Sequence, residues 1–413
     1  MGTRVRQTRP RPLRNRSVTD LALVAFWTGL LWVAYTYAGY PILLWLIGLV
    51  SRVRPESWDD FLPSVSVLIS ARNEEQDIGW KVAETLAWDY PLERLDVLVA
   101  SDASEDRTDE IAQAIEDPRV MLVRMEKRGG KGRALNRLAE LAHGEVLFFT
   151  DANAHIAPHC LSRMVGHFAN PKVGCVTGHS YSGLAEGSPV AETGTVVYWG
   201  HELLVKSLES RLGSVLACDG AIFCIPRSLY SPVSPELAND LELPLRIYHA
   251  GYQVRFEPQA RVLEKDTVSP SQEFSRRRRI CAQGVLAMIR LQRTLRGMRA
   301  IQFLSCKVSR WLTAVPMALL LLSSAAMMHR PFFAALFALQ AAFYIAAVAG
   351  VIQAARTGSV NKLLSVPLYV AVSSLGALAG VFDALRGRRF DVWESPALTR
   401  GIRDRALGAV RTL

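Results

Sequence analysis

Residues 146–154 read VLFFTDANA and place two oxygen-bearing side chains directly after an apolar run. The run predicts a strand buried on both faces, and open α/β sheets bind their ligands where such strands end. Asp151 and Asn153 lie two residues apart, so in a turn both side chains can converge on one hard cation or on a ribose hydroxyl. The same residues are also typical of an Asx turn ahead of Pro158. The stretch by itself leaves both interpretations open.

The surrounding sequence predicts an α/β fold that would position these side chains. Apolar runs at residues 64–70, 95–101, 120–124 and 145–150 predict strands, and helix-like stretches at 74–87, 107–115 and 131–142 separate them. This alternation predicts a mainly parallel sheet with its ligand site at the carboxyl ends of the strands. The sequence has neither a GxGxxG turn after the first run nor a Walker loop, which disfavours dehydrogenase and P-loop functions.

Apolar segments outside this region predict membrane helices. Half of the 413 residues are apolar, which indicates more than one core or a membrane part. Residues 21–50 carry no charge and exceed the roughly 20 residues that a helix needs to cross hydrocarbon. Residues 311–328, 332–355 and 363–382 are further candidates, so the sequence predicts four membrane spans.

The formal net charge of +10 is concentrated in arginine clusters beside the apolar segments. Six arginines precede Ser17, and a second cluster runs from Arg276 to Arg299. Nucleic acid is one partner for such clusters, but beside membrane segments they more simply meet anionic lipid headgroups. From Arg290 onward the arginines interleave with apolar side chains, which predicts an amphipathic helix at the membrane surface. The six cysteines show no CxxC pair and no zinc-ligand spacing, which indicates a reducing compartment.

Five segments in a fixed order carry a family resemblance. They are SVSVLISARNEE, LDVLVASDASEDRT, KRGGKGRALN, VLFFTDAN and NDLELPLRIYHAGYQVRFEP. Over residues 63–310 the chain thereby resembles the membrane-bound family 2 glycosyltransferases of the synthase-like subgroup. The resemblance implies the GT-A fold of nucleotide-diphospho-sugar transferases, an α/β fold with a mixed, mainly parallel sheet, joined here to transmembrane α-helices. It also implies a nucleotide-sugar donor and a divalent cation, Mg²⁺ or Mn²⁺.

The resemblance assigns a donor nucleotide site. The implied residues are Ala71, Arg72, Glu74, Asp102, Lys131, Asp151 and Arg279. Arg72 replaces the aromatic residue that is often found at its position. Asp102 would accept hydrogen bonds from the base, although it could instead cap the next helix, as Ser104 and Asp106 are expected to do. Lys131 matches a basic residue near the nucleotide, and its alternative is an exposed lysine at a helix start.

The resemblance also answers the question about Asp151 and Asn153, because they occupy the DxD motif of the family. The first acid of that motif faces the ribose and the metal, and the second is a metal ligand. Asn153 departs from the pattern, since its amide oxygen can bind a cation but brings no negative charge. We therefore expect a metal site at Asp151 and Asn153 with lowered affinity or a further ligand.

A general base for inverting transfer is implied by the sequence ELANDLELPLRI. Asp240 matches the aspartate of the ED motif of the family, with Asn239 in place of the glutamate, and it would take the proton of the acceptor hydroxyl. The alternative for Asp240 is a helix N-cap. The segment CDGAIFCIPRSLY resembles the acceptor-side segment, in which Asp219 and Gly220 are the candidates.

The segment EFSRRRRICAQG lies where processive members carry the QxxRW motif. Arg279 matches the arginine and is expected to pair with the diphosphate, since a guanidinium suits phosphate oxygens. Arg276 stands where glutamine is expected, and Ile280 replaces the tryptophan that stacks on a sugar. Because Ile280 cannot stack in this way, we expect one or a few sugars to be added per binding event.

The sequence therefore predicts a membrane-embedded, inverting glycosyltransferase. It would move a sugar from a nucleotide-diphosphate donor to a lipid-linked or growing oligosaccharide in cell-surface or exopolysaccharide synthesis. A processive polysaccharide synthase that also translocates its product is the alternative within the family. A non-catalytic nucleotide-binding membrane sensor is the alternative from another class, because Asn153, Asn239 and Ile280 depart from the family pattern. The enzyme is favoured by four retained motif residues, Asp102, Asp151, Asp240 and Arg279. The membrane segments disfavour nucleic acid as a partner.

The expected organisation follows from these assignments. The divisions are a basic tail at 1–20, a transmembrane segment at 21–50, a GT-A domain at 52–270, an amphipathic interfacial region at 271–310, three transmembrane helices at 311–385 and a basic tail at 386–413. Nucleotide sugars are made in the cytosol, so we expect a multi-pass protein of a bacterial inner membrane with a cytoplasmic catalytic domain. A single first crossing then puts both termini outside, against the usual preference of arginine. If the first segment instead entered and returned as a hairpin near Gly39 and Pro41, this conflict would be avoided, but each arm of the hairpin would be short for a full crossing.

Overall fold

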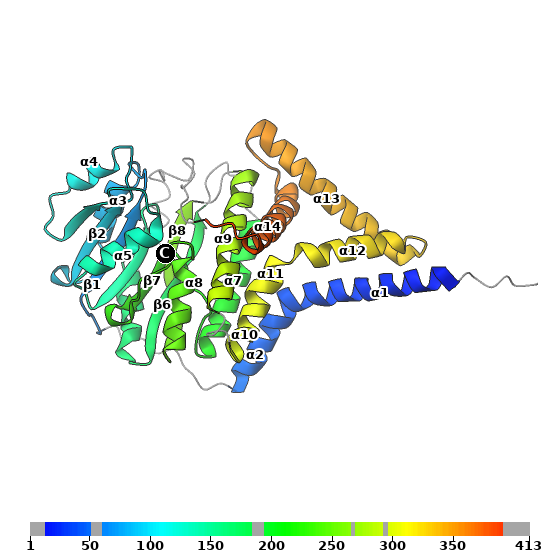
Figure 1. Ribbon diagram of the computed structural model, residues 1–413, viewed down its shortest axis with the longest axis horizontal. Coiled ribbons are helices and arrows are strands. Elements are labelled where there is room, and N and C mark those ends of the chain that lie inside the picture. The colour runs from blue at the N-terminus through cyan, green and yellow to red at the C-terminus, as the bar shows by residue number, and fades with distance from the viewer. Residues whose placement is uncertain (1–12, 51–59, 184–193, 266–268, 292–295, 391–413) are drawn as a thin grey trace, which may run out of the picture.

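The structure joins an α/β domain to a group of long apolar helices. The computed structural model describes residues 13–50, 60–183, 194–265, 269–291 and 296–390. Figure 1 shows the sheet on one side of the molecule and the helices α1, α12 and α13 projecting away from it on the other.

The described strands form one eight-stranded sheet in the order β3-β2-β1-β4-β7-β6-β8-β5. The strands are β1 (Val65–Ala71), β2 (Leu95–Ser101), β3 (Val120–Arg124), β4 (Val146–Asp151), β5 (His155–Ile156), β6 (Val173–Gly183), β7 (Ile222–Pro226) and β8 (Gln253–Lys265). The pairs β1–β2, β1–β4, β2–β3 and β6–β8 are parallel, and β4–β7, β6–β7 and β5–β8 are antiparallel. The predicted mixed, mainly parallel sheet is therefore confirmed.

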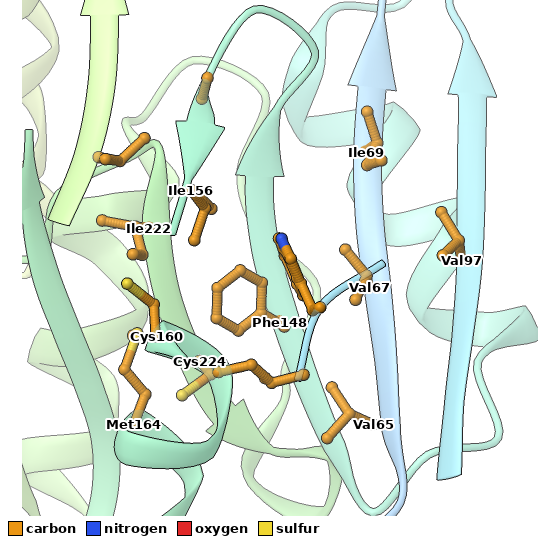
Figure 2. Packing of buried hydrophobic residues seen from close by; sticks show 14 of the residues in the cluster. Val65, Val67, Ile69, Val97, Phe148, Ile156, Cys160, Met164, Ile222 and Cys224 are labelled. Carbon is orange, nitrogen blue, oxygen red and sulfur yellow. The ribbon is translucent and has the colours of Figure 1, made fainter. Parts of the chain in front are cut away.

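Two hydrophobic cores cover the two faces of the central strands. In β4, Phe148 enters one core and Phe149 enters the other, and in β1 the same is true of Val67 and Leu68. Figure 2 shows the core that contains Phe148 and Val67. Each fully buried side chain of this kind contributes about 1.5–3 kcal/mol relative to an exposed one. This explains why β4 reads as an unbroken apolar run and ends abruptly at a polar loop.

Helices fill the spaces beside the strands. They are α3 (Ile78–Leu86), α4 (Thr108–Gln113), α5 (Lys131–Leu141), α6 (Cys160–Gly166), α7 (Gly194–Arg211), α8 (Asn239–His249) and α9 (Pro270–Arg290), with 3₁₀ turns at Leu92–Arg94, His167–Ala169 and Arg227–Leu229. The predicted strands at 95–101 and 120–124 match their bounds in the structure. The first helix begins later than predicted, because Asn73 has a φ of 53° and the chain turns before α3 begins.

The remaining helices include the long apolar ones. They are α1 (Leu13–Ala34), a π-helical turn (Tyr35–Gly39), α2 (Tyr40–Val50), α10 (Met298–Phe303), a second π-helical turn (Leu304–Val308), α11 (Ser309–Trp311), α12 (Ala314–Ala326), α13 (Pro331–Thr357) and α14 (Lys362–Leu385). In the described part of the chain, three helices are long and apolar enough to cross a membrane, namely Val18–Leu49, Pro331–Thr357 and Lys362–Leu385. Met298–Trp311 and Ala314–Ala326 form a pair bent by 57°, which counts as a fourth if it is one span.

The first apolar segment is helical throughout, so the alternative of a hairpin near Gly39 and Pro41 is wrong. Tyr40 has helical dihedral angles, with φ of −66° and ψ of −49°. The chain bends at the π-helical turn but does not reverse its direction (Figure 1). At this turn the Tyr35 hydroxyl lies 2.6 Å from the hydroxyl oxygen of Ser305, which belongs to the other π-helical turn.

Helix α14 packs closely on α9. A side chain at Gly376 would lie 2.7 Å from the Phe274 carbonyl oxygen, so this glycine permits backbone contact between the helices. Arg278 pairs with Asp383 near the end of α14. Beyond α14, the Phe390 carbonyl oxygen accepts a hydrogen bond of 3.1 Å from Gln283 on α9. The chain from the end of α14 to Phe390 therefore lies beside α9.

The arginines that follow α9 do not all line a membrane surface. Arg299 is 2% exposed, and its guanidinium donates to the Ser214 and Val215 carbonyl oxygens. It also stacks over the ring of Tyr248, at 3.6 Å from the ring centre. The prediction of a surface position is therefore wrong for Arg299.

Candidate active site

Three adjacent strands bring the predicted donor residues to one edge of the sheet. In the pairing of β1 with β4 and β2, Ser70 lies opposite Asp151, and Ala71 lies opposite Ser101. Since these strands are parallel, their carboxyl ends meet at the same edge. The loops that carry Asp102 and Asp151 therefore start side by side.

The loops after β1 and β2 are tied to each other. The Ala71 carbonyl oxygen accepts a 2.9 Å hydrogen bond from the Asp102 amide, and Arg72 donates to the Asp102 carbonyl oxygen at 3.0 Å. Arg72 also forms an ion pair of 2.9 Å with Glu105. The amide of Glu74 donates to the Thr108 hydroxyl at 2.8 Å. These contacts give the loop that holds Ala71, Arg72 and Glu74 a fixed conformation.

Asp102 fixes the turn ahead of α5. Its carboxylate accepts hydrogen bonds of 2.6 Å and 2.8 Å from the amides of Gly129 and Gly130. Gly130 has a φ of 81°, which only glycine adopts without strain. The alternative that Asp102 caps the next helix, α4, is wrong, because its carboxylate holds the turn before α5. Lys131, the first residue of α5, is positioned by this turn.

The two expected helix caps behave differently. Asp106 accepts from the Thr108 amide at 3.0 Å and from the Glu75 amide at 3.1 Å, so it closes an Asx turn at the start of α4. Ser104 accepts from the Asn73 amide at 3.2 Å and lies 2.9 Å from the Ser101 hydroxyl. Ser104 therefore joins the two loops, and its prediction as a cap was wrong.

Lys131 is paired, which rules out the alternative of a solvated lysine. Its ammonium donates to Asp151 at 2.5 Å and to the Gly220 carbonyl oxygen at 3.3 Å. The side chains of Lys131 and Asp151 are 26% and 31% exposed, so the pair stays open to ligands. A partly exposed ammonium held in this way is suited to a phosphate oxygen.

Asp240 lies on the other side of Gly220. A Cβ atom at Gly220 would be only 3.4 Å from the Asp240 carboxylate, so only glycine leaves this space open. The surrounding protein desolvates Asp240 and raises its pKa, an effect that Lys131 and Lys307 oppose and Asp219 reinforces. The N-cap of α8 is Ala238, and Asp240 lies inside the first turn, so the alternative of an N-cap was wrong.

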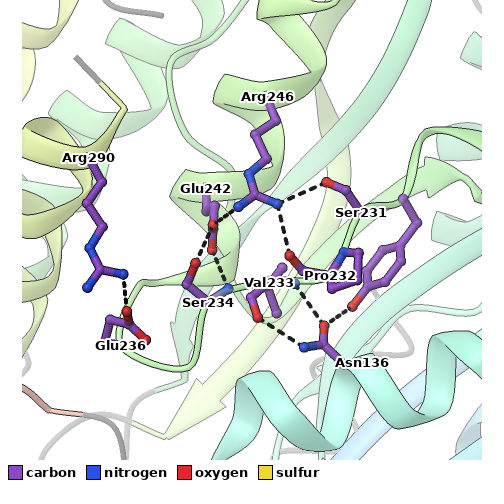
Figure 3. Close-up of polar contacts among 10 residues, drawn as sticks. Asn136, Ser231, Pro232, Val233, Ser234, Glu236, Glu242, Arg246 and Arg290 are labelled. Atoms are coloured by element: carbon purple, nitrogen blue, oxygen red, sulfur yellow. Dashed lines mark hydrogen bonds and ion pairs between the residues drawn. The ribbon is translucent and has the colours of Figure 1, made fainter. Parts of the chain in front are cut away.

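A loop between β7 and α8 joins the helices that carry these residues (Figure 3). Asn136 of α5 donates to the Val233 carbonyl oxygen at 3.0 Å and accepts from its amide at 2.8 Å. Ser234 donates to Glu242 of α8 through its amide and its hydroxyl, both at 2.9 Å. Arg290 of α9 pairs with Glu236 of the same loop. The loop thus sets α5, α8 and α9 relative to one another.

Arg279 reaches the same region from α9. Desolvation lowers its pKa to about 10, and Arg276 acts in the same direction, while Asp240 and Asp151 oppose the shift. The guanidinium stays protonated near neutral pH and lies within the field of both carboxylates. It donates a long hydrogen bond of 3.4 Å to Gln283 of the same helix.

Asp219 lies next to this group, but its carboxylate is engaged elsewhere. It accepts from the Ser180 amide at 2.7 Å, the Ser180 hydroxyl at 2.9 Å and the Ala221 amide at 3.2 Å. Lys206 lies 4.0 Å away, and Asp219 is 8% exposed. Asp219 therefore fixes the turn that presents Gly220, which leaves Gly220 as the open position on the predicted acceptor side.

Comparison with known families agrees with this geometry. Glycosyl transferase family 2 matches residues 66–223, and Glycosyl transferase family group 2 matches residues 146–352, which is just over half of the chain. The protein is a family 2 glycosyltransferase. The predicted family and the prediction of an enzyme are confirmed.

Curated relatives of the glycosyltransferase match part of its length. A beta-monoglucosyldiacylglycerol synthase of Synechocystis sp. is 29% identical over 182 residues, which are 39% of this chain and 38% of the relative. The probable glycosyltransferase YdaM of Bacillus subtilis is 28% identical over 215 residues, covering 50% of this chain and 51% of the relative. The chain thus spans less than two thirds of the length of these relatives.

A solved structure shares the fold. The mannosyltransferase PcManGT from Pyrobaculum calidifontis, in complex with GDP-Man and Mn²⁺, gives a TM-score of 0.67 at 21% sequence identity. The similarity covers 89% of this chain and 99% of that chain, so it includes helices outside the sheet. The predicted GT-A fold is confirmed.

The donor set of the glycosyltransferase fits a cation that binds together with a ligand. The described residues contain no group of three or more His, Cys, Asp or Glu that could hold a metal ion by themselves. Asp151 and Asn153 supply oxygen atoms, and Mg²⁺ commonly takes one or two protein ligands and fills its other positions with water and phosphate. Such a donor set suits a metal diphosphate better than a free metal ion.

Sequence reasoning missed two parts of the site. The amides of Gly129 and Gly130, which hold Asp102, were signalled by the double glycine in KRGGKGRALN. Lys81 is fully buried beneath the loop that follows Asp151. Its signal was a lysine between the apolar residues of IGWKVAETL, on the side of the helix that a core would cover.

Proposed function

We propose that this glycosyltransferase is an inverting, membrane-embedded enzyme that transfers a sugar from a nucleotide-diphosphate donor to the hydroxyl of a lipid-linked or growing saccharide. The observation that carries the proposal is the grouping of Lys131, Asp151 and Asp240 around Gly220. The grouping supplies a cation for a leaving diphosphate and a carboxylate for an attacking hydroxyl within one site.

Donor binding is proposed for the edge formed by β1, β2 and β4. Ala71, Arg72, Glu74 and Asp102 would line the nucleoside, and Lys131 and Arg279 would contact the diphosphate. Mg²⁺ or Mn²⁺ at Asp151 and Asn153 would neutralise the charge that develops on the leaving diphosphate. The complex of the related mannosyltransferase with GDP-Man and Mn²⁺ supports this choice of donor and cation.

Asp240 is proposed as the general base. It would take the proton of the acceptor hydroxyl as the oxygen attacks the anomeric carbon from the face opposite the diphosphate. A raised pKa makes the carboxylate a better proton acceptor than an ordinary surface aspartate. Gly220 would let the acceptor approach, because no side chain separates its backbone from Asp240.

Membrane embedding is supported by the exposed apolar surface of the long helices. Leu21 in α1, Leu339 and Ile345 in α13 and Leu363 in α14 are each more than two thirds exposed. Such surfaces need a lipid environment. We propose a multi-pass protein of a bacterial inner membrane with a cytoplasmic GT-A domain near residues 52–270. The glycolipid synthase among its relatives supports an acceptor drawn from the membrane.

A processive synthase is the second candidate within the family. Ile280 is 38% exposed and lacks the flat ring with which a tryptophan would hold a sugar. We therefore propose the addition of one or a few sugars per binding event in cell-surface or exopolysaccharide synthesis. Long polymer at limiting enzyme, without short intermediates, would favour the processive alternative.

The proposal is tested by incubating membranes that contain the enzyme with a panel of radiolabelled nucleotide sugars. We expect label from one donor to enter a lipid or oligosaccharide fraction, and we expect EDTA to abolish the transfer. Membranes with Asp151→Ala serve as the matched control. Nucleotide binding without transfer from any donor would instead support the non-catalytic sensor.

A further inference from the structure

Three residues of α3 contact three successive residues that follow Asn153. The Lys81 ammonium donates to the Ala154 carbonyl oxygen at 2.6 Å, and Glu84 accepts from the Ile156 amide at 2.8 Å. Between them, the ring of His155 packs against Trp80 with ring centres 3.8 Å apart. The loop that carries Asp151 and Asn153 is thereby fixed from one side by a single helix.

The contact between α3 and the loop is made by buried charge. The Lys81 side chain is 0% exposed, and its ammonium lies 3.4 Å from Glu84, which is 11% exposed. The neighbours Ile78 and Val82 on α3 are fully buried in an apolar core. An apolar residue at position 81 would fill the same kind of space without desolvating an ammonium.

Stability alone gives no reason for such a pair. Burying two charges costs several kcal/mol per ion, and replacing a buried pair by apolar residues of similar volume is often neutral or stabilising. What the pair adds is direction, because an ammonium and a carboxylate bind the loop backbone at defined points. Both of its backbone bonds go to residues 154–156.

We propose that Lys81 and Glu84 are positioning residues for the metal loop, and that they fix the spacing of Asp151 and Asn153. The inference rests on the proposed assignment of these two residues to the cation. Asn153 brings no charge, so the affinity of the site depends more on preorganisation than it would with two carboxylates. A loop released from α3 would lose cation affinity while the rest of the domain stayed folded.

The test uses the double variant Lys81→Met/Glu84→Leu, which removes both charges and keeps most of the volume. Binding of Mn²⁺ is titrated by electron paramagnetic resonance, in parallel with UDP and with GDP, and the melting temperature is measured alongside. We expect Mn²⁺ affinity to fall about ten-fold or more, which is about 1.4 kcal/mol. The melting temperature should fall less than the loss of Mn²⁺ affinity alone would suggest for a misfolded protein, because the apolar replacements offset part of the cost of the two backbone hydrogen bonds that are lost at Ala154 and Ile156.

The matched control is Arg137→Met/Glu140→Leu, an exposed pair with the same spacing on α5, at 2.9 Å. It should leave Mn²⁺ affinity unchanged. Normal Mn²⁺ affinity in the Lys81→Met/Glu84→Leu variant would overturn the proposal. If that variant does not fold, Lys81→Met alone decides by the same titration, because it removes the donor to the Ala154 carbonyl oxygen while Glu84 keeps its bond to the Ile156 amide. A lower Mn²⁺ affinity in Lys81→Met supports the proposal, and an unchanged affinity overturns it.

Failure of the underlying metal assignment is distinguished by Asp151→Ala. If Asp151→Ala keeps normal Mn²⁺ binding, the metal site itself is misplaced. If Asp151→Ala abolishes binding while the double variant binds normally, the metal site stands and only the role of α3 is refuted.

Discussion

Replacing Asp240 by asparagine separates catalysis from folding and from donor binding. Asparagine has nearly the same shape and preserves the spacing to Gly220, but it cannot accept a proton. A positioned general base contributes about 10²–10⁴-fold to rate, so we expect kcat to fall by that factor. Donor affinity should stay within about two-fold, because the base acts only as the hydroxyl is deprotonated.

The direction of the pKa shift of Asp240 adds a second expectation for Asp240→Asn, which is that its stability should not fall although its activity does. Desolvation raises the pKa of Asp240 above its unfolded value. A carboxyl of this kind stabilises the fold most at a pH below its unfolded pKa, and this contribution is lost as the pH rises through the folded pKa. Above the folded pKa the ionised carboxylate is therefore unfavourable, and in that pH range Asp240→Asn should raise the melting temperature or leave it unchanged.

The assay compares transfer of labelled sugar in proteoliposomes with calorimetric donor binding and thermal melting. Glu140→Gln, which neutralises an exposed acid, is the control and should change none of these. In the unsubstituted enzyme, kcat should fall as the pH drops through the raised pKa of Asp240. Unchanged kcat in Asp240→Asn would remove Asp240 from the mechanism. A joint loss of transfer, donor affinity and melting temperature would make its role structural.

Three further experiments test the geometry of the site and the topology of the chain. Asp102→Ala frees the amides of the double-glycine turn, so we expect a lower melting temperature and an increased donor KM, measured by thermal melting and steady-state kinetics. Gly220→Ala puts a methyl group 3.4 Å from the carboxylate of Asp240, the proposed base. We expect kcat to fall or the acceptor KM to rise, while the donor affinity measured by calorimetry stays unchanged. Cysteines placed singly at His329, Ser359 and Arg388 of a cysteine-free variant can be probed with an impermeant thiol reagent on intact cells. Labelling is expected at position 329 alone, and labelling at 388 would contradict a cytoplasmic end of α14.

The sequence predicted four of the eight described strands, β1 to β4, because these strands follow from local pattern, and it did not predict β5 to β8. A strand buried on both faces reads as an unbroken apolar run, so β2 and β3 were placed to the residue and β4 to within one. The polar loops after the strands could be recognised in the same way. Their convergence on one edge follows from parallel pairing, which the alternation of strands and helices already implied.

The contacts of the site could not be predicted, because they join residues that are far apart in the chain. Asp102 is satisfied by two amides 27 and 28 residues away, and Lys81 binds a carbonyl oxygen 73 residues away. No periodicity encodes such a contact. Arg299 shows the same limit, since interleaved charge is typical of a surface helix, and only tertiary contacts with Ser214 and Val215 reveal a buried cation.

The position of α14 also bears on the topology of the chain. A cytosolic nucleotide-sugar donor places the domain in the cytoplasm, whereas the arginines of the two termini were then expected outside, against the charge rule. Hydropathy alone treats α14 as a crossing, which would carry Arg386, Arg388 and Arg389 away from the catalytic domain. The contacts of Arg278 with Asp383 and of Gln283 with Phe390 instead keep this end of the chain beside α9. With the domain and α9 in the cytoplasm, as we propose, we expect these arginines on the side that the charge rule prefers.

The arginines before Ser17 are then the one cluster on the side of the membrane that the charge rule disfavours. Their side depends on the direction in which α1 leaves the domain. The close contact of Gly29 with Pro316 and Leu320 packs α1 along α12, so both helices leave the domain together. We therefore expect the loop from α12 to α13 and the start of α1 to share one side of the membrane. A label that reaches His329→Cys but not Ser359→Cys would place both of them outside and the catalytic domain inside.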